Sequence, residues 1–177
     1  MPNIMRFGSG GKSGGIIKQI LRGTYTANAV SSITNFNIPL ATKVVPQNCA
    51  ILIYTGTSST SFYDCSVTED TLTIRSSGAI NYSYEVIEFD KIKSLQRGAF
   101  NSVGSGVARK LTLTPVVMEK SLVLLSVPYH MVAGRDLAEF NAFTLYYTWR
   151  SNSEIFVYSQ SASDRTNPLC WNVVEFE

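Results

Sequence analysis

The chain has 177 residues, of which 45% are hydrophobic and 16% charged, and it carries a formal net charge of +2 at pH 7. This composition predicts a soluble globular protein with a sizeable core. The charge is spread without a run of lysine or arginine, which disfavours a nucleic-acid role. The longest apolar runs are strand-length, far short of the roughly 20 residues that cross a bilayer, so neither membrane insertion nor a secretory leader is expected.

The first segment, residues 1–15, is rich in glycine and serine and contains the fragment GGKSGG. A nucleotide-binding phosphate loop would need Gly-x-x-x-x-Gly-Lys-Ser, but Arg6 occupies the place of the first glycine. The segment is instead predicted to be a flexible arm, because it has too little apolar surface to offset its ordering entropy. In an assembly, four apolar side chains would anchor this arm on a neighbouring subunit: Met1, Ile4, Met5 and Phe7.

Three sequence blocks recur in the same order along the chain. IKQILRGTY from Ile17 matches IKSLQRGAF from Ile92, VPQNCAILIYTG from Val45 matches VMEKSLVLLSVP from Val117, and YEVIEF from Tyr84 matches WNVVEF from Trp171. Such order is typical of a tandem duplication. We therefore predict an arm (1–15), a first β unit (16–89) and a homologous second β unit (90–177), the two units packing rigidly together.

The local pattern within each unit is that of β-strands. Segments such as FTLYYTWRS alternate β-branched or aromatic residues with polar ones, and Gly, Pro, Asn and Ser clusters separate them at strand-length intervals. The closing strand of each unit is apolar on both faces, which predicts a central position in its sheet. The expected fold is all-β, with two tandem duplicated β-sandwich units that resemble jelly rolls.

The sequence contains few residues that suggest catalysis. The single histidine, His130, cannot form a His-based metal site, and no Ser-His-Asp arrangement or nucleophile elbow accompanies it. Two acidic pairs could be imagined as glycosidase carboxylates, Glu69 with Asp70 and Asp136 with Glu139, but such residues are usually solvated turn residues. We therefore predict no enzymatic activity, no catalytic residue, no cofactor and no metal.

The three cysteines, Cys49, Cys65 and Cys170, fit neither a disulfide framework nor a metal cage. Each lies among apolar residues typical of strands, and free cysteine is among the most buried residue types. They are predicted to be buried small hydrophobes, and whether any two of them pair is left open.

Aromatic residues crowd the second unit. Those that suggest an interface or a glycan contact are Tyr146, Tyr147, Trp149 and Tyr158. The alternative is that most of them fill the core, because small β domains depend on a few large side chains for burial.

Each unit has an Arg-Gly after its first strand, Arg22-Gly23 and Arg97-Gly98, and a glutamate in its last strand. Because a charge inside an apolar strand is costly to bury alone, we expect the first and last strands to be neighbours, with Arg22 paired to Glu88 and Arg97 paired to Glu175. The alternative is that these charges face water independently.

The blocks IKSLQRG, LTLTPVVMEKSLVLLS and WNVVEF together resemble a recurrent pattern in small structural proteins of tailed bacteriophages, often labelled tail or tail-fibre proteins. The resemblance covers most of the second unit and a weaker part of the first. It implies a non-enzymatic β module that assembles into virions, made in the host cytoplasm.

The function expected from these observations is that of a virion component in the tail, tail fibre or outer decoration. Its partners would be other copies of itself and other virion proteins, with a host-surface glycan as a candidate contact for loops of the second unit. Head or tail location, oligomer symmetry and host are left open. The alternative is a carbohydrate-binding β-sandwich module, in which the aromatic residues would form the binding platform.

Overall fold

The computed structural model describes residues 16–55, 61–103, 108–126, 144–160 and 167–177. These segments form strands, turns and two short 3-10 helices, so the all-β prediction is confirmed. The predicted arm, with its anchors Met1, Ile4, Met5 and Phe7, lies outside the described residues.

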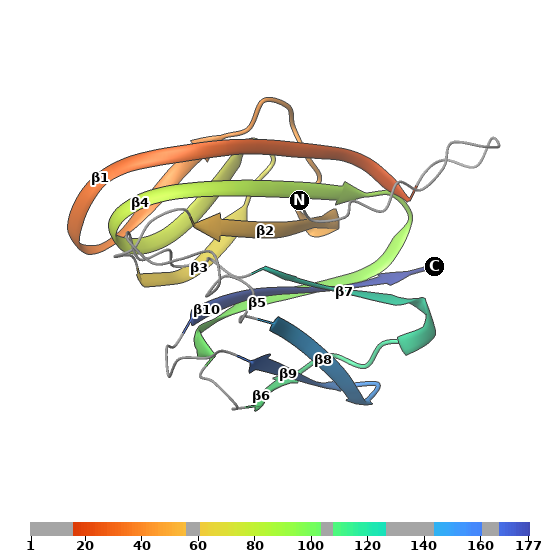
Figure 1. Cartoon of the computed structure of the whole chain (residues 1–177). Coiled ribbons are helices and arrows are strands. Elements are labelled where there is room, and N and C mark those ends of the chain that lie inside the picture. Colours follow the sequence, from red (N-terminus) through yellow and green to blue (C-terminus); the bar gives the residue numbers. More distant parts are fainter. Residues whose placement is uncertain (1–15, 56–60, 104–107, 127–143, 161–166) are drawn as a thin grey trace.

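The first half of the chain, residues 16–89, has four strands. They are β1 (Ile17–Pro39), β2 (Cys49–Thr55), β3 (Ser61–Val67) and β4 (Thr71–Phe89), with the 3-10 helix η1 (Pro46–Asn48) before β2. All pair antiparallel in one sheet of order β1-β4-β2, in which β3 also pairs with β4. The long strands β1 and β4 bend together (Figure 1), and register shifts between Ala27 and Thr34 lie in this pair.

The second half, residues 90–177, repeats this pattern with shorter strands. They are β5 (Ile92–Val103), β6 (Ala108–Thr112), β7 (Ser121–Ser126), β8 (Thr144–Ser151), β9 (Glu154–Gln160) and β10 (Asn167–Phe176), with η2 (Met118–Lys120) before β7. Its two sheets have the orders β5-β10-β7 and β6-β9-β8. The long strand β1 corresponds to two strands of the second half, β5 followed by β6. The long strand β4 likewise corresponds to β9 followed by β10.

Equivalent residues of the two halves have equivalent partners across the sheet. Gly23 of β1 lies opposite Tyr84 of β4, and Gly98 of β5 lies opposite Trp171 of β10. The aromatic ring covers the glycine in both places, and the indole Cζ2 of Trp171 would be 2.8 Å from a Cβ on Gly98. The register of these cross-strand pairs is therefore the same in the two halves.

Each half has an apolar core between its strands, and the core of the first half also includes Cys170 of β10. In the first half, buried side chains from all four strands meet, among them Phe36, Ile51, Phe62 and Val86. In the second half the core is smaller and includes Leu111, Val123, Ile155, Leu169 and Val173. The all-β class is thus established, and the division into two duplicated sandwich units stays a prediction.

The closing strands β4 and β10 are central in their sheets, as predicted, because each pairs with a strand on both sides. The two halves also share a third apolar cluster, in which Leu52, Ile87 and Phe89 pack with Val174 and its neighbours. The rings of Phe89 and Phe176 meet edge to face, with centroids 5.9 Å apart. In Figure 1, β2 of the upper half therefore lies next to β10 and β7 of the lower half.

Candidate functional site: the contact between the two halves

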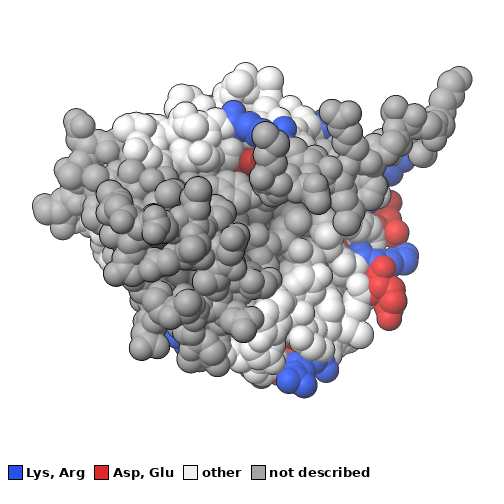
Figure 2. Space-filling view, viewed as in Figure 1, with Lys and Arg blue, Asp and Glu red and all other residues white. Residues whose placement is uncertain are grey.

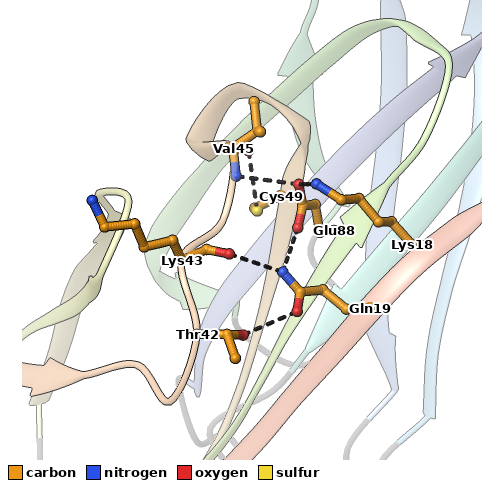
Figure 3. A network of polar contacts seen from close by, with 7 residues as sticks. All are labelled: Lys18, Gln19, Thr42, Lys43, Val45, Cys49 and Glu88. Carbon is orange, nitrogen blue, oxygen red and sulfur yellow. Dashed lines mark hydrogen bonds and ion pairs between the residues drawn. The ribbon is translucent and has the colours of Figure 1, made fainter.

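The carboxylate of Glu88 lies buried near the end of β4 and is held by three donors (Figure 3). Lys18 Nζ donates to Oε1 at 2.7 Å, Gln19 Nε2 donates to Oε2 at 2.5 Å, and the Val45 amide donates to Oε1 at 3.3 Å. Cys49 lies beside this network and donates its thiol to the Val45 carbonyl at 3.2 Å. The carboxylate thus ties β1 and β4 to the segment that leads into β2.

Glu175 of β10 has the same arrangement in the second half. Lys93 Nζ donates to Oε1 at 2.9 Å, the Ser94 hydroxyl donates to Oε2 at 3.1 Å, and the Val117 amide donates to Oε1 at 3.0 Å. Each of these donors occupies the repeat position of its counterpart at Glu88. The buried glutamate is therefore a duplicated feature of the fold.

Both carboxyl groups are ionised in the folded protein. Burial raises the pKa of Glu88, but the hydrogen bonds from Lys18, Gln19 and the Val45 amide outweigh burial and bring this pKa below its ordinary value. For Glu175, the Lys93 hydrogen bond is the largest influence and lowers the pKa, with the Val117 amide adding to it. Because both oxygens of each group already accept hydrogen bonds, these sites suit structural anchoring better than proton transfer.

The predicted pairing of these glutamates with arginines is wrong, although the first and last strands of each half are neighbours as expected. Arg22 instead donates through Nε to Glu85 at 2.7 Å, and Arg97 donates to main-chain carbonyls. The physical reason is the pleat of the strands. Glu88 points into the core side of β4, whereas Arg22 lies opposite Glu85 on the other face.

The free edge of β2 is capped by side chains of the second half. Asn172 accepts the Ile51 amide at 3.0 Å and donates to the Ile51 carbonyl at 2.9 Å. Ser126 accepts the Ile53 amide at 3.0 Å. The carboxamide of Asn172 therefore makes the pair of bonds that a neighbouring strand would make.

A third capping residue, Arg97, completes this edge. Its Nη1 donates to the Cys49 carbonyl at 2.7 Å and to the Pro46 carbonyl at 3.2 Å. We call Arg97, Ser126 and Asn172 the capping trio. A strand edge without such partners would present unpaired main-chain groups, which a protein normally covers or pairs.

The repeat places three other residues at the positions of the capping trio, on the first half. They are Arg22, Tyr54 and Glu85, which we call the equivalent trio. Tyr54 is 40% exposed, and the Arg22–Glu85 ion pair lies at the surface. Partial burial and the neighbouring Glu85 carboxylate raise the pKa of Tyr54, so its hydroxyl keeps the proton at neutral pH and can donate.

The edge of β7 in the second half is the counterpart of the β2 edge. It pairs with β10 on one side, and no described strand lies on the other. Beside it, Val117, Met118 and Leu122 are each 37 to 41% exposed, and we call them the apolar rim. The counterpart of Leu122 in the first half is Ala50, which is fully buried against the second half.

The aromatic residues predicted as an interface divide between core and surface. Tyr146 and Tyr158 stack on the outer side of β8 and β9, with ring centroids 4.9 Å apart, and Arg150 donates to the Tyr158 hydroxyl at 3.3 Å. Tyr147 is also largely exposed. Trp149 is not part of this surface, because it packs against the core of the second half.

Two cysteines from different halves come close together. Cys65 of β3 and Cys170 of β10 lie with their Sγ atoms 3.9 Å apart. Cys49 and Cys170 are buried as predicted, whereas Cys65 is only partly buried. All three are free thiols. Burial raises the pKa of Cys49 to about 11 and that of Cys170 well above its ordinary value, so neither is a reactive thiolate at neutral pH.

The remaining candidates add no catalytic arrangement in the part of the chain that the structure describes. His130, Asp136 and Glu139 lie outside that part. Glu69 bonds to Lys43 at 3.3 Å at the surface, and Asp70 accepts hydroxyl bonds within the turn before β4. The described residues contain no group of His, Cys, Asp and Glu side chains that could hold a metal ion.

The capping trio was not expected as a unit, and neither were the lysines that hold the two glutamates. Lys18 and Lys93 occur at the same place in the repeated IK blocks, which is a signal for a shared role. Asn172 is the polar residue on an otherwise apolar face of β10, and a buried amide requires partners. These signals identify polar residues that need partners, but they do not identify the partners.

The surface of the described residues offers no broad patch of one charge on the side seen in Figure 2, where acidic and basic side chains lie intermixed along one edge. None of the described segments forms a helix long and apolar enough to span a membrane. Comparisons with protein-family models, with curated proteins and with solved structures gave no match.

Proposed function

We propose that this chain is a non-enzymatic structural protein of a tailed-phage virion, in the tail, the tail fibre or an outer decoration, and that it acts through subunit assembly. The sequence resemblance to small phage tail proteins supports the virion location. The exposed β7 edge and the apolar rim beside it support assembly with other subunits. Its partners are other copies of itself and other virion proteins.

The observation that carries the proposal is the apolar rim at the free edge of β7. Val117, Met118 and Leu122 are exposed together beside a strand edge that has no partner among the described strands. Exposed apolar residues are normal singly, but three within six residues of the chain favour an interaction site. A strand edge next to it supplies main-chain groups that another chain can bind.

The proposal also includes the tandem origin of the two halves and a role for the arm. The repeated strand order and the repeated glutamate sites support a duplicated unit of residues 16–89 and 90–177. Residues 1–15 would order on a neighbouring copy and lock the assembly, because a segment that folds on binding contributes a large contact surface.

Sedimentation velocity of the purified chain over a wide concentration range tests this function. We expect the mean mass to rise above that of one chain as the concentration increases, and particles of regular shape to be visible by electron microscopy. A variant without residues 1–15 should keep its thermal midpoint but assemble less well. A wild-type chain that stays monomeric throughout, alone and with candidate virion proteins, would contradict the proposal.

A second candidate function, carbohydrate binding, is favoured by the aromatic surface of β8 and β9. Tyr146 and Tyr158 present ring surface there beside Arg150, and aromatic faces stack on sugars. A glycan array decides this point. Binding that is lost in Tyr146→Ala but kept in a variant of the apolar rim, Met118→Ala, would support the carbohydrate-binding alternative.

A further inference from the structure

We propose that a second copy of this chain docks its equivalent trio (Arg22, Tyr54 and Glu85) onto the β7 edge, so that the contact between the two halves is repeated between molecules. This inference rests on the proposed self-assembly and names its geometry. It follows from comparing equivalent positions in the two halves.

Within the molecule, the contact has an edge and a cap. The edge is β2, whose outward main-chain groups at Cys49, Ile51 and Ile53 bond to the capping trio. The cap is the face of the β5-β10-β7 sheet that carries this trio. Asn172 and Ser126 of the trio are almost fully buried, so their bonds to β2 are shielded from water.

The second half has a matching edge that is not capped. β7 pairs with β10 in the same register as β2 pairs with β4, so Ser121, Val123 and Leu125 take the places of Cys49, Ile51 and Ile53. The Ser121 amide bonds to the Met118 carbonyl. The outward amides and carbonyls of Val123 and Leu125 have no partner among the described residues. The β7 edge is therefore an edge of the same kind as the one that β2 presents.

The first half has a matching cap, the equivalent trio, and no main-chain edge among the described strands bonds to it. Arg22 stands where Arg97 stands in the second half, so its guanidinium can donate to main-chain carbonyls as Arg97 does. Glu85 occupies the position of Asn172, and its carboxylate can accept a hydrogen bond from a main-chain amide. Tyr54 occupies the position of Ser126 and adds a hydroxyl donor.

The apolar rim supplies the burial that such a contact needs. Leu122 is 39% exposed, whereas its counterpart Ala50 is fully buried in the contact between the halves. Val117 and Met118 correspond to Val45 and Pro46, which are both less exposed. Leu122 and Met118 are thus larger than their counterparts Ala50 and Pro46, and the more exposed site carries the larger apolar side chains, which fits an interface between copies.

The proposed contact joins two different surfaces. The edge lies in the second half and the cap in the first, so a pair of molecules joined by one contact still has one free edge and one free cap. Such a heterologous contact forms a ring if the rotation between neighbours closes, and a filament if it does not.

Two variants test this arrangement by complementation in sedimentation velocity. The edge variant is Leu122→Glu, and the cap variant is Arg22→Glu, with Tyr54→Ala as a milder second cap variant. Each variant should weaken self-association at least about tenfold, the loss expected for a central interface residue. The edge variant still has an intact cap, and the cap variant still has an intact edge. In an equimolar mixture these two intact surfaces should bind each other, giving a dimer of one chain of each kind and nothing larger.

The matched control is Tyr146→Glu, a charge placed on an exposed aromatic residue away from both surfaces. It should assemble like wild type, and all variants should keep the wild-type thermal midpoint. Edge and cap variants that assemble normally, or a mixture that forms no dimer, would overturn the proposed contact even if the wild type assembles. A wild type that never associates would instead overturn the proposed function itself.

Discussion

The carboxamide of Asn172 faces the main chain of Ile51, 121 residues away, and exchanges two hydrogen bonds with it, at 3.0 and 2.9 Å. The pair links the two halves at a fully buried position. Removing it in Asn172→Ala leaves a buried amide and a buried carbonyl unpaired. We expect a loss of at least about 2 kcal/mol in the free energy of unfolding, measured by urea denaturation.

The repeat provides the control for this variant. Glu85 takes the position of Asn172 in the first half, where it lies in a surface ion pair. Glu85→Ala should change the free energy of unfolding by less than about 1 kcal/mol. Similar losses in Asn172→Ala and Glu85→Ala would show that the bonds to Ile51 contribute little.

The glycines under the cross-strand rings should differ in their tolerance of a methyl group. A Cβ on Gly98 would lie 2.8 Å from Cζ2 of Trp171, whose indole is packed in the core of the second half. We expect Gly98→Ala to cost about 1 to 3 kcal/mol by overpacking. Gly23→Ala should cost less, because the nearest atoms are at the outer end of the Tyr84 ring, which can tilt away.

Urea denaturation of a double variant checks the cause. In a Trp171→Leu background the ring is gone, so the cost of Gly98→Ala should fall to near zero. An unchanged cost in that background would mean that the strand, and not the ring, rejects the methyl group.

The two buried glutamates should make stability depend on pH. Because the folded pKa of Glu88 and that of Glu175 lie below the ordinary value of 4.5, their stabilisation is present above that value and is lost as the pH falls through the folded pKa. Glu88→Gln should therefore be less stable than wild type at pH 7, and the difference between the two should narrow below pH 4.5. Thermal midpoints at several pH values measure this.

Lysine variants separate the buried site from ordinary surface pairs. Lys18→Met removes the main charged partner of Glu88 and should lower the thermal midpoint at pH 7. Lys43→Met breaks the exposed pair with Glu69 and should have little effect. Equal effects of these two variants would count against a special role for the buried carboxylate.

Oxidation should link the two halves through Cys65 and Cys170. Their sulfur atoms are 3.9 Å apart, and side-chain rotation can bring them to the 2.05 Å of a disulfide. Diamide accepts the two thiol hydrogens as the S–S bond forms. The cross-link should stabilise the fold by about 2 to 4 kcal/mol, because it closes a long loop in the unfolded chain.

Mass spectrometry of the oxidised chain should find the Cys65–Cys170 linkage in wild type and in Cys49→Ser, but not in Cys65→Ser. A linkage that forms only after the chain is unfolded in urea would show that the two thiols cannot meet in the fold.

Sequence patterns predicted the strands of both halves and the central position of β4 and β10, because these depend on local alternation and on burial of both faces. The predicted pairing of Arg22 with Glu88 was wrong, although the alternation of apolar and polar residues in β1 indicates that Arg22 faces away from the core. Leu21 and Tyr25 face the core of the first half, so Arg22, on the opposite parity, faces outward.

The contact between the halves could not be predicted in this way. Asn172 was visible as a polar residue within an apolar strand, but its partner is a main-chain group, which has no signature in the sequence. The closeness of Cys65 and Cys170 likewise depends on how the two sandwiches pack. The β7 edge is recognised as a candidate contact surface only when its residues are compared with the equivalent residues of β2 in the structure.

Amide hydrogen exchange at four positions tests the central claim most directly. The amides of Ile51 and Ile53 are capped within the molecule and should exchange slowly at every protein concentration. The amides of Val123 and Leu125 should exchange rapidly in dilute solution and become protected as the chain assembles. If these two amides continue to exchange rapidly at concentrations where sedimentation shows assembled protein, the β7 edge is not the surface through which the copies join.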